Sequence, residues 1–409
     1  MKLDIRALLV CVWCTATIEA FTQSSQHLYN PAAQQQQLVS RRQHIRTQNP
    51  NPFTDNEVAT RVVNRALFSS VTSTDSTVFS LPSSITSSPM GRFKAALTKF
   101  GMMSFIASMC LALPLALFPP FALLKLRLIN RIQKEQMALH AGQFCARWLM
   151  RLIPFASVKT IPYHDENPEP SIWVCNHVSS LDIFMLLATD LKLRGKNKRP
   201  MKIVYWKQLE DNPITKLLFQ QSGFIPVQMS ANKAGEANDY DMKSFKALLK
   251  SAKQAFDEGF DIGILPEGQL NPHPEEGLLP CFSGAFTLAR MSKRPIHMMA
   301  LHGTHRLWHA REDIDMTVTG RDVQVRCYPK GRKYKSGEEF LATFEAVVGE
   351  FGTNGRDLED AELNAWLDGS KWEQIQAAKA EDEKKILEEQ QKRKQTAKEE
   401  QLQMAQGRR

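Results

Sequence analysis

Between residues 155 and 350 the chain alternates short apolar runs with longer segments of helical periodicity. The apolar runs have the length and side-chain content of buried strands. They are Ser171–Cys175, Met201–Tyr205, Gly223–Val227, Asp261–Leu265 and Ile296–Leu301, and the helix-like segments between them include 181–193, 242–258 and 282–292. Strands that alternate with helices predict an α/β layer architecture.

A run without any charged residue, Phe100 to Leu124, precedes this pattern and is long enough to cross a hydrocarbon core of about 30 Å. Lysine or arginine flanks it on both sides. Its three prolines remove backbone donors and bend helices. Residues 99–125 are therefore expected to form a membrane-embedded helix or a helical hairpin, and a buried core helix is the alternative.

The segments on either side of the α/β pattern read as helices. Residues 126–152 are predicted to lie either on lipid headgroups or against the α/β domain, which is expected to span 126–352. Residues 353–409 follow the domain, and from Lys371 onwards they are almost entirely Glu, Lys, Gln and Ala, with no sustained heptad seam. They predict a charged, solvated C-terminal helix or tail.

The N-terminus has the layout of a targeting leader. Lys2 and Arg6 precede a short apolar run, and small residues continue to Ala20, which predicts a signal peptide over 1–20. Residues 21–98 are rich in Ser, Thr, Gln and Asn and poor in acidic residues, as transit peptides are. With Phe21 at the junction, the leader resembles the bipartite plastid-targeting leaders of diatoms and related algae. A plastid membrane is the expected location, and the endoplasmic reticulum is the alternative.

The net charge of +9 favours anionic partners such as a lipid surface or a phosphorylated substrate. No nucleic-acid-binding motif accompanies this charge, so no nucleic-acid partner is expected. The seven cysteines suggest no disulfide framework. The histidines near residue 305 lack a Cys or acidic partner at ligand spacing, so no metal is expected either.

One strand-to-helix turn carries a histidine and an aspartate five residues apart, His177 and Asp182. Histidine is the side chain best suited to take a proton near neutral pH. A carboxylate across the turn can accept the other ring N–H and fix the tautomer, and the nucleophile would then be a substrate hydroxyl. By itself the pair is equally compatible with a helix cap and a buried, hydrogen-bonded histidine.

A second turn, Leu265 to Asn271, ends the strand at 261–265. Pro266 and Gly268 tighten it, and its free backbone N–H groups can face an anion. Alone, this sequence is only a turn signal.

With about 85 residues between them, the two turns resemble the motifs of the glycerolipid acyltransferases, the lysophosphatidic acid acyltransferases in particular. The resemblance covers roughly residues 130–350. Its first motif, NHxSxxD, matches at 176–182, the second corresponds to 223–229, the third to 265–271 and the fourth to 295–304. The family implies a mixed sheet flanked by helices, with His177 and Asp182 as catalytic residues. The residues that it implies for substrate binding are Asn176, Ser179, Lys207, Gly223, Glu267, Gly268, Gln269 and Asn271.

The same resemblance implies the reaction. His177 would deprotonate a lysophospholipid hydroxyl, which would attack the thioester of acyl-CoA or acyl-carrier protein. The expected acceptor is 1-acyl-sn-glycerol 3-phosphate and the product phosphatidic acid; the partners are membrane lipids, acceptor and donor, with no further cofactor. The alternatives are acylation or transacylation of another lysophospholipid, as by tafazzin-type enzymes, and a non-catalytic lipid-binding protein.

Two departures from the family pattern concern phosphate binding. Gln228 and Met229 stand where the second motif has an arginine, and Leu270 where the third has one. Leucine cannot replace the two parallel hydrogen bonds that arginine gives to phosphate. The basic residues nearby that are candidates to compensate are Lys202, Lys207, Lys233, Arg290, Lys293 and Arg294.

Overall fold

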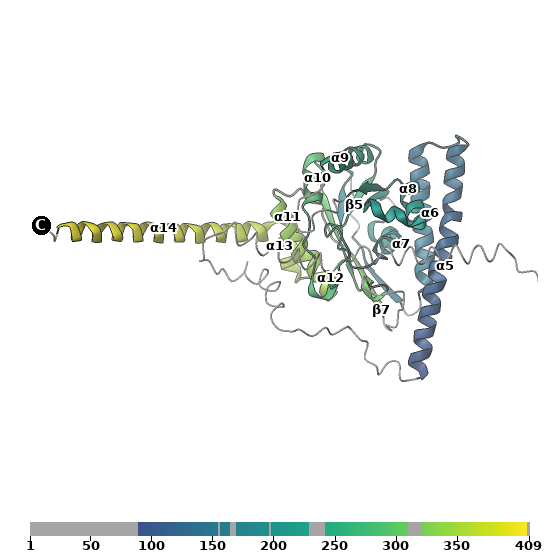
Figure 1. The fold of residues 1–409 in the computed structure, drawn as a ribbon, viewed down its shortest axis with the longest axis horizontal. Coiled ribbons are helices and arrows are strands. Elements are labelled where there is room, and N and C mark those ends of the chain that lie inside the picture. Colours follow the sequence, from purple (N-terminus) through teal and green to yellow (C-terminus); the bar gives the residue numbers. More distant parts are fainter. Residues whose placement is uncertain are drawn as a thin grey trace, which may run out of the picture.

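The computed structural model describes residues 89–153, 156–163, 169–195, 198–228, 242–309 and 321–406. The expected signal peptide and nearly all of the expected transit segment lie outside the described residues. A sheet with helices on both faces forms the centre of the molecule (Figure 1).

The sheet has seven strands in the order β1-β7-β6-β2-β5-β3-β4. Their bounds are β1 Ala156–Ile161, β2 Ile172–Val174, β3 Met201–Trp206, β4 Ile225–Val227, β5 Asp261–Ile264, β6 Ile296–His302 and β7 Arg321–Cys327. From β6 to β4 every neighbouring pair is parallel, whereas β7 runs antiparallel to β6. This mixed sheet confirms the predicted fold class, and the five expected apolar runs all contribute strands.

The central strands β2 and β6 supply side chains to two separate hydrophobic cores because successive residues point to opposite faces. Trp173 packs on the face covered by helices α5 to α8, while its neighbours Ile172 and Val174 pack on the other face. The helices are α5 Pro89–Lys125, α6 Arg131–Leu149, α7 Asp182–Arg194, α8 Pro213–Ser222, α9 Met242–Asp257, α10 Gly284–Ser292, α11 Gly337–Phe344, α12 Glu350–Asn354, α13 Asp360–Asp368 and α14 Ser370–Gln406. A sheet covered on both faces requires fully apolar central strands, and β2 and β6 are buried along their whole length.

The uncharged run forms part of one continuous helix, α5, which passes through its three prolines without folding back. Of the two forms expected for this segment, the helix is found and an internal hairpin is not. Residues Phe100–Lys125 make up the one helix among the described residues that is long and apolar enough to span a bilayer, and 44% of its most apolar window is buried. The buried side packs against α6, which runs beside α5 (Figure 1).

Helix α6 begins at a capping box, in which the Asn130 side chain accepts from the Gln133 backbone and the Gln133 side chain accepts in return. It packs against α7 and α8, so of the two placements expected for this segment, packing against the domain is the one found.

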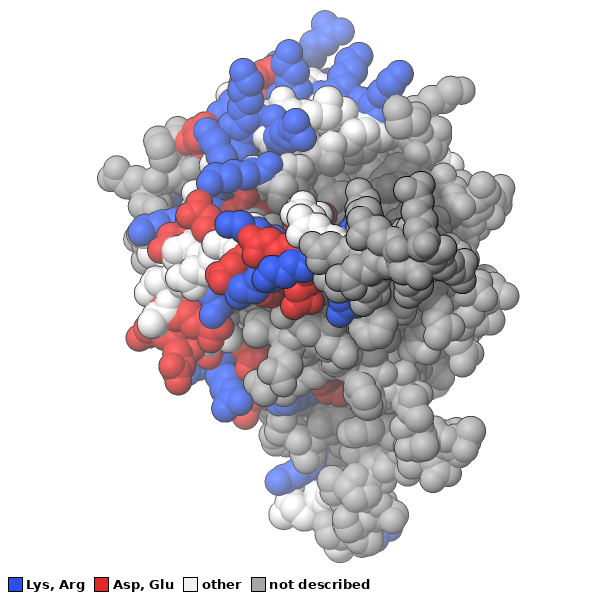
Figure 2. Space-filling view, turned by 90° about the vertical axis from the view of Figure 1, so that its left-hand side faces the viewer, with Lys and Arg blue, Asp and Glu red and all other residues white. Residues whose placement is uncertain are grey.

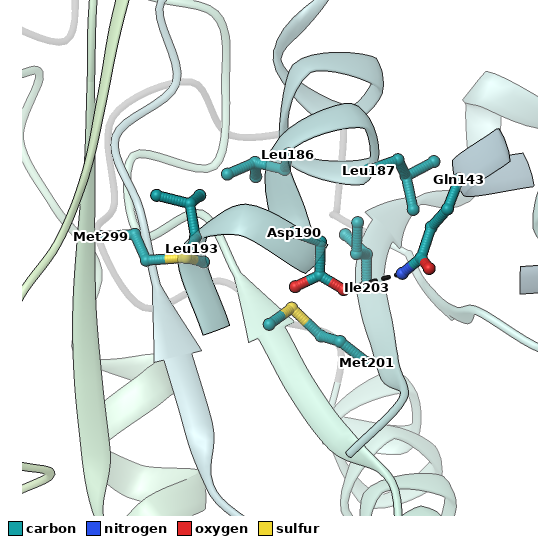
Figure 3. A pocket seen from close by; sticks show the side chains of 8 residues that line it. All are labelled: Gln143, Leu186, Leu187, Asp190, Leu193, Met201, Ile203 and Met299. Carbon is teal, nitrogen blue, oxygen red and sulfur yellow. Dashed lines mark hydrogen bonds between the residues drawn. The ribbon is translucent and has the colours of Figure 1, made fainter. Parts of the chain in front are cut away.

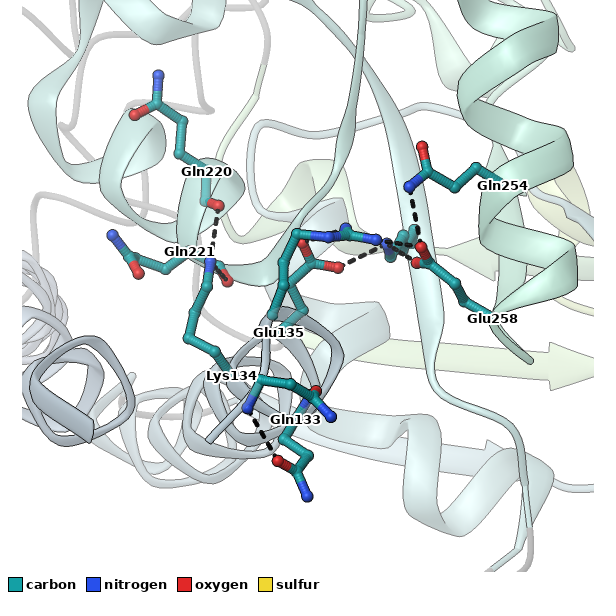
Figure 4. Close-up of polar contacts among 10 residues, drawn as sticks. Gln133, Lys134, Glu135, Gln220, Gln221, Gln254 and Glu258 are labelled. Atoms are coloured by element: carbon teal, nitrogen blue, oxygen red, sulfur yellow. Dashed lines mark hydrogen bonds and ion pairs between the residues drawn. The ribbon is translucent and has the colours of Figure 1, made fainter. Parts of the chain in front are cut away.

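Buried charges fix α6 on the sheet (Figure 4). The Lys202 ammonium donates to Glu135 Oε2 over 2.6 Å, and both side chains are nearly inaccessible. The Lys134 ammonium donates to the Gln221 carbonyl at the end of α8 over 2.9 Å. Gly223, with φ of +67°, closely approaches the same carboxylate, since a Cβ there would lie 2.4 Å from the Glu135 carboxyl carbon. Losing one partner of such a buried pair leaves an uncompensated charge, so α6 and the sheet are strongly coupled.

Between α6, α7 and β3 the packing leaves a small, mainly apolar hollow (Figure 3). Its walls include Leu187, Met201 and Ile203. On one side Gln143 Nε2 donates to Asp190 Oδ2 over 2.7 Å, which satisfies the two polar groups that face these apolar walls.

Packing continues beyond the expected domain boundary at residue 352. In α13, Leu363, Trp366 and Leu367 are buried in the core on the α9–α11 face. Helix α14 then projects away from the domain (Figure 1). In the view along this helix, acidic and basic side chains interleave (Figure 2). Within α14, Glu381 and Lys385 form an ion pair one helical turn apart. This is the charged, solvated helix predicted for the C-terminal segment.

Candidate active site

The two motif turns lie side by side at the carboxyl edge of the parallel strands. The residues that follow β2 include His177, and those that follow β5 include Glu267; β2 and β5 are neighbours in the sheet. Ligands of α/β sheets bind at this edge, because the loops after the strands meet there.

Asp182 binds the His177 ring, as the sequence predicts. His177 Nδ1 and Asp182 Oδ2 are 2.9 Å apart, and the same oxygen accepts the backbone N–H groups of Val178 and Ser179 over 2.7 and 2.8 Å. Asp182 is fully buried, whereas 21% of the His177 side chain is exposed. The carboxylate therefore holds Nδ1 and leaves Nε2 as the ring nitrogen that can exchange a proton with a substrate.

Glu267 is hydrogen-bonded to the backbone of His177 and does not face solvent. Its Oε1 accepts the backbone N–H of His177 over 2.6 Å, and its Oε2 accepts that of Leu279 over 2.9 Å. The side chain is fully buried. Burial raises the pKa of Glu267 to about 7, although the two backbone hydrogen bonds and the His177 ring oppose this shift. Glu267 thus connects the two motif turns through its hydrogen bonds, and its expected contact with substrate stays a prediction.

The side chains of Asn176 and Ser179 also form hydrogen bonds that hold the motif turn in place. The Asn176 side chain donates to the carbonyl of Leu301 and accepts its N–H, both over 2.8 Å, which continues the β2–β6 pairing beyond β2. Ser179 Oγ donates to the Trp308 carbonyl over 2.8 Å. Both residues are fully buried, so the motif turn is tied to the segment that follows β6.

The remaining predicted substrate residues fall into two groups. Gly268, Gln269 and Asn271 are in the turn after β5; the Asn271 backbone N–H donates to the His177 carbonyl over 2.8 Å, and its side chain donates to the Gly277 carbonyl over 2.7 Å. Lys207 is exposed after β3, at the same edge but two strands from β2.

Gly223 is not brought to this site. It precedes β4 and therefore lies towards the opposite edge of the sheet, at the close contact with Glu135. Its positive φ and that contact account for a glycine at this position.

No basic side chain stands at the two motif positions where the family has an arginine. Leu270 is buried, and Gln228 is exposed after the edge strand β4. Lys202 forms an ion pair with Glu135, and Arg294 forms one with Glu169 over 3.2 Å. Lys233 lies outside the described residues.

Two histidines outside the motif, His297 and His302, have local packing roles. His297 stacks on Trp173 with ring centroids 4.3 Å apart, and His302 Nδ1 lies 2.9 Å from the Gly352 carbonyl oxygen. In the part of the chain that the structure describes, no three His, Cys, Asp or Glu side chains gather as metal ligands would.

The sequence alone did not reveal the residues that brace the motif from a distance. Leu301 and Trp308 contribute only backbone atoms, and Leu279 only its N–H. The one available signal was the predicted strand at 296–301, whose carboxyl end had to lie at the same edge as that of β2 once the two were parallel.

The chain is similar to known acyltransferases. Residues 160–302 match the Acyltransferase family model. The chain is 28% identical over 181 residues to the 1-acyl-sn-glycerol-3-phosphate acyltransferase of Saccharomyces cerevisiae, an alignment that covers 44% of this chain and 54% of the yeast protein. The chain thus spans about half the length of this curated relative. A crystal structure of the 1-acyl-sn-glycerophosphate acyltransferase PlsC from Thermotoga maritima superposes with a TM-score of 0.45 at 17% identity, over 65% of this chain and 96% of that one.

The match over residues 160–302 contains the complete His177–Asp182 turn and the Glu267 turn that supports it. Over residues 160–302 the chain is therefore similar to the acyltransferases, and this similarity supports a PlsC-like glycerolipid acyltransferase domain in that part of the chain.

Proposed function

We propose that this protein transfers an acyl chain from a thioester to the free hydroxyl of 1-acyl-sn-glycerol 3-phosphate, giving phosphatidic acid. The observation that carries the proposal is the partly exposed His177 ring, held at Nδ1 by a fully buried Asp182. The reaction named for the yeast relative supports it.

In the proposed reaction, His177 Nε2 takes the proton from the acceptor hydroxyl while its oxygen forms a bond to the thioester carbonyl carbon. The carbon–sulfur bond then breaks, and the leaving thiolate takes the proton from the imidazolium. Asp182 stabilises the imidazolium between these steps, because its carboxylate stays 2.9 Å from Nδ1. A general base contributes typically about 10² to 10⁴ in rate, so the positioning of two lipidic substrates must supply much of the rest.

The outer face of α5 supports a membrane location for this chemistry. Large apolar side chains stay exposed along the helix, among them Leu115 at 73% and Phe118 at 65%. On α6, Phe144 and Trp148 are exposed and in ring contact, and the Arg151 guanidinium lies over Trp148. Exposed large apolar side chains with a cation beside them are typical of a protein that contacts a bilayer.

The test is label transfer from a radiolabelled acyl thioester to a panel of lysolipids by the purified full-length protein. We expect His177→Ala to lose activity by at least about 10², while His140→Ala, an exposed histidine on α6, keeps it. Equal transfer by wild type and His177→Ala, with both folded, would rule out the proposed mechanism.

The panel also separates the alternatives. The absence of arginine at residues 228 and 270 favours another lysophospholipid, or transacylation between two phospholipids. Activity without a thioester donor would identify transacylation, and liposome binding without turnover would identify a lipid-binding protein. Parallel reactions with acyl-carrier protein and coenzyme A thioesters assign the donor. A fluorescent fusion of residues 1–99 tests the proposed plastid location against the endoplasmic reticulum.

A further inference from the structure

We propose that Arg306 binds the phosphate of the acceptor and so replaces the two arginines that the motifs lack. The inference rests on the proposed function, because it specifies how that site recognises a phosphorylated acceptor. Arg306 is outside the four motifs as they match this chain, and it follows the last of them by two residues.

The topology of the sheet removes most of the other basic candidates. Arg290, Lys293 and Arg294 precede β6, and Lys202 is near the start of β3. Both strands are parallel to their neighbours on the β2 side, so these four residues lie at the amino edge of the sheet, away from His177. Lys202 and Arg294 are in addition paired with carboxylates.

Arg306, by contrast, follows the carboxyl end of β6, which pairs directly with β2. It belongs to the short 3-10 turn Thr304–Arg306. Two residues later, the Trp308 carbonyl accepts the hydrogen bond from Ser179 Oγ over 2.8 Å, so the segment that follows this turn is held against the His177 motif. Strand β6, which precedes Arg306, lies one strand spacing of about 5 Å from β2. Strand β3, which precedes Lys207, lies two spacings from β2 in the opposite direction.

The charge of Arg306 is available for a ligand. The side chain is half-buried, and within the described ranges no carboxylate forms a hydrogen bond or ion pair with it. Burial, together with the nearby Arg306 guanidinium, lowers the pKa of His305 to about 3. His305 is therefore neutral at pH 7, and Arg306 carries the fixed positive charge of this turn.

Buried polar atoms of the same two turns add hydrogen-bonding capacity. Across the described part of the chain, Ser180 Oγ, Thr304 Oγ1 and His305 Nδ1 are buried and have no hydrogen-bond partner. Buried polar groups in folded proteins are almost always satisfied, so three such atoms in two hydrogen-bonded segments point to a polar ligand. A phosphate offers several acceptor oxygens to hydroxyl and imidazole donors and two parallel acceptors to a guanidinium.

The experiment compares wild type, Arg306→Ala, Arg306→Lys and Arg290→Ala as full-length proteins. The control removes an exposed arginine at the amino edge of the sheet. Initial rates are measured with 1-acylglycerol 3-phosphate and with 1-monoacylglycerol, which differs by the phosphate alone. Saturation-transfer NMR with glycerol 3-phosphate reports binding without turnover.

For Arg306→Ala we expect KM for the phosphorylated acceptor to rise about ten- to hundredfold, the effect of one charged hydrogen-bonding partner, and the rate with 1-monoacylglycerol to stay within twofold. The rise in KM should be smaller for Arg306→Lys, since lysine keeps the positive charge but cannot form two parallel hydrogen bonds to the phosphate. The glycerol 3-phosphate signal disappears in Arg306→Ala and persists in Arg290→Ala.

Equal KM values and equal glycerol 3-phosphate signals for Arg306→Ala and Arg290→Ala would overturn the role of Arg306, as would the absence of any signal in wild type. Wild type that binds glycerol 3-phosphate through Arg306 yet transfers no acyl group would instead overturn the proposed function and leave the phosphate site standing.

Discussion

Replacing Asp182 by asparagine separates its charge from its hydrogen bonds. One carboxylate oxygen, Oδ2, accepts all three hydrogen bonds from His177 Nδ1 and from the Val178 and Ser179 backbones. The other, Oδ1, is buried without a partner among the described residues. The amide oxygen of asparagine can therefore take the place of Oδ2 and keep the turn and the histidine tautomer.

The expected loss of activity follows from the missing charge. The imidazolium and carboxylate charges are centred about 4 Å apart, where an effective dielectric constant of about 20 gives about 4 kcal/mol of attraction. Since about 1.4 kcal/mol is tenfold in rate, Asp182→Asn should lower kcat by about 10³. The new amide N–H₂ occupies the unpartnered position and should cost about 1–3 kcal/mol of stability.

Asp182→Ala is the matched comparison, because it removes the charge and all three hydrogen bonds. It leaves two backbone N–H groups and the ring N–H unpaired, and should destabilise the protein by about 3 kcal/mol or more. The assay is single-turnover acyl transfer together with thermal unfolding in the same detergent. An Asp182→Asn protein with kcat within tenfold of wild type would refute the charge argument, and one as unstable as Asp182→Ala would refute the hydrogen-bond argument.

Three further predictions concern stability and membrane binding. Because the pKa of Glu267 is raised to about 7 from its usual 4.5, its neutral form contributes stability that is complete below about pH 4.5 and is lost as pH rises through 7. The stability of wild type relative to Glu267→Gln, measured by thermal unfolding, should therefore fall by about 1–3 kcal/mol between pH 5 and 8. A pH-independent difference would contradict this. Gly223→Ala drives a Cβ into a buried carboxylate, whereas Gly259→Ala has the same left-handed strain and open space around it, so denaturant unfolding should show about 1–3 kcal/mol more destabilisation for the former, and equal losses would rule out the contact. Phe118→Asp should reduce flotation with liposomes severalfold, while Met291→Asp, equally exposed on α10, should not; unchanged flotation of Phe118→Asp would remove α5 as the membrane-binding face.

The sequence predicted the central architecture because its strands are buried on both faces. Such strands are continuous apolar runs, as in Ile172–Val174 and Ile296–His302, and are visible without tertiary information. The antiparallel strand β7, Arg321–Cys327, was not among the predicted strands. Its polar and apolar residues alternate, and its direction depends on pairing with β6, which local sequence does not encode.

The site was predictable where its partners are close in sequence. His177 and Asp182 are five residues apart and form the expected hydrogen bond. Asn176 and Ser179 belong to the same motif, but the groups that they bind are 125 and 129 residues away. Polar residues in a motif turn are compatible with ligand contacts and with bracing, and only the burial of both side chains distinguishes the two.

The buried contact between Glu135 and Lys202 has a mechanical consequence. It joins the helix pair α5–α6 to β3 without an intervening flexible linker. In the proposed membrane-bound state, the catalytic edge of the sheet would then keep one tilt and one depth relative to the lipid headgroups. The acceptor would have to enter along a fixed direction from the bilayer, so the orientation of the protein on the membrane would itself select which end of a lipid reaches His177.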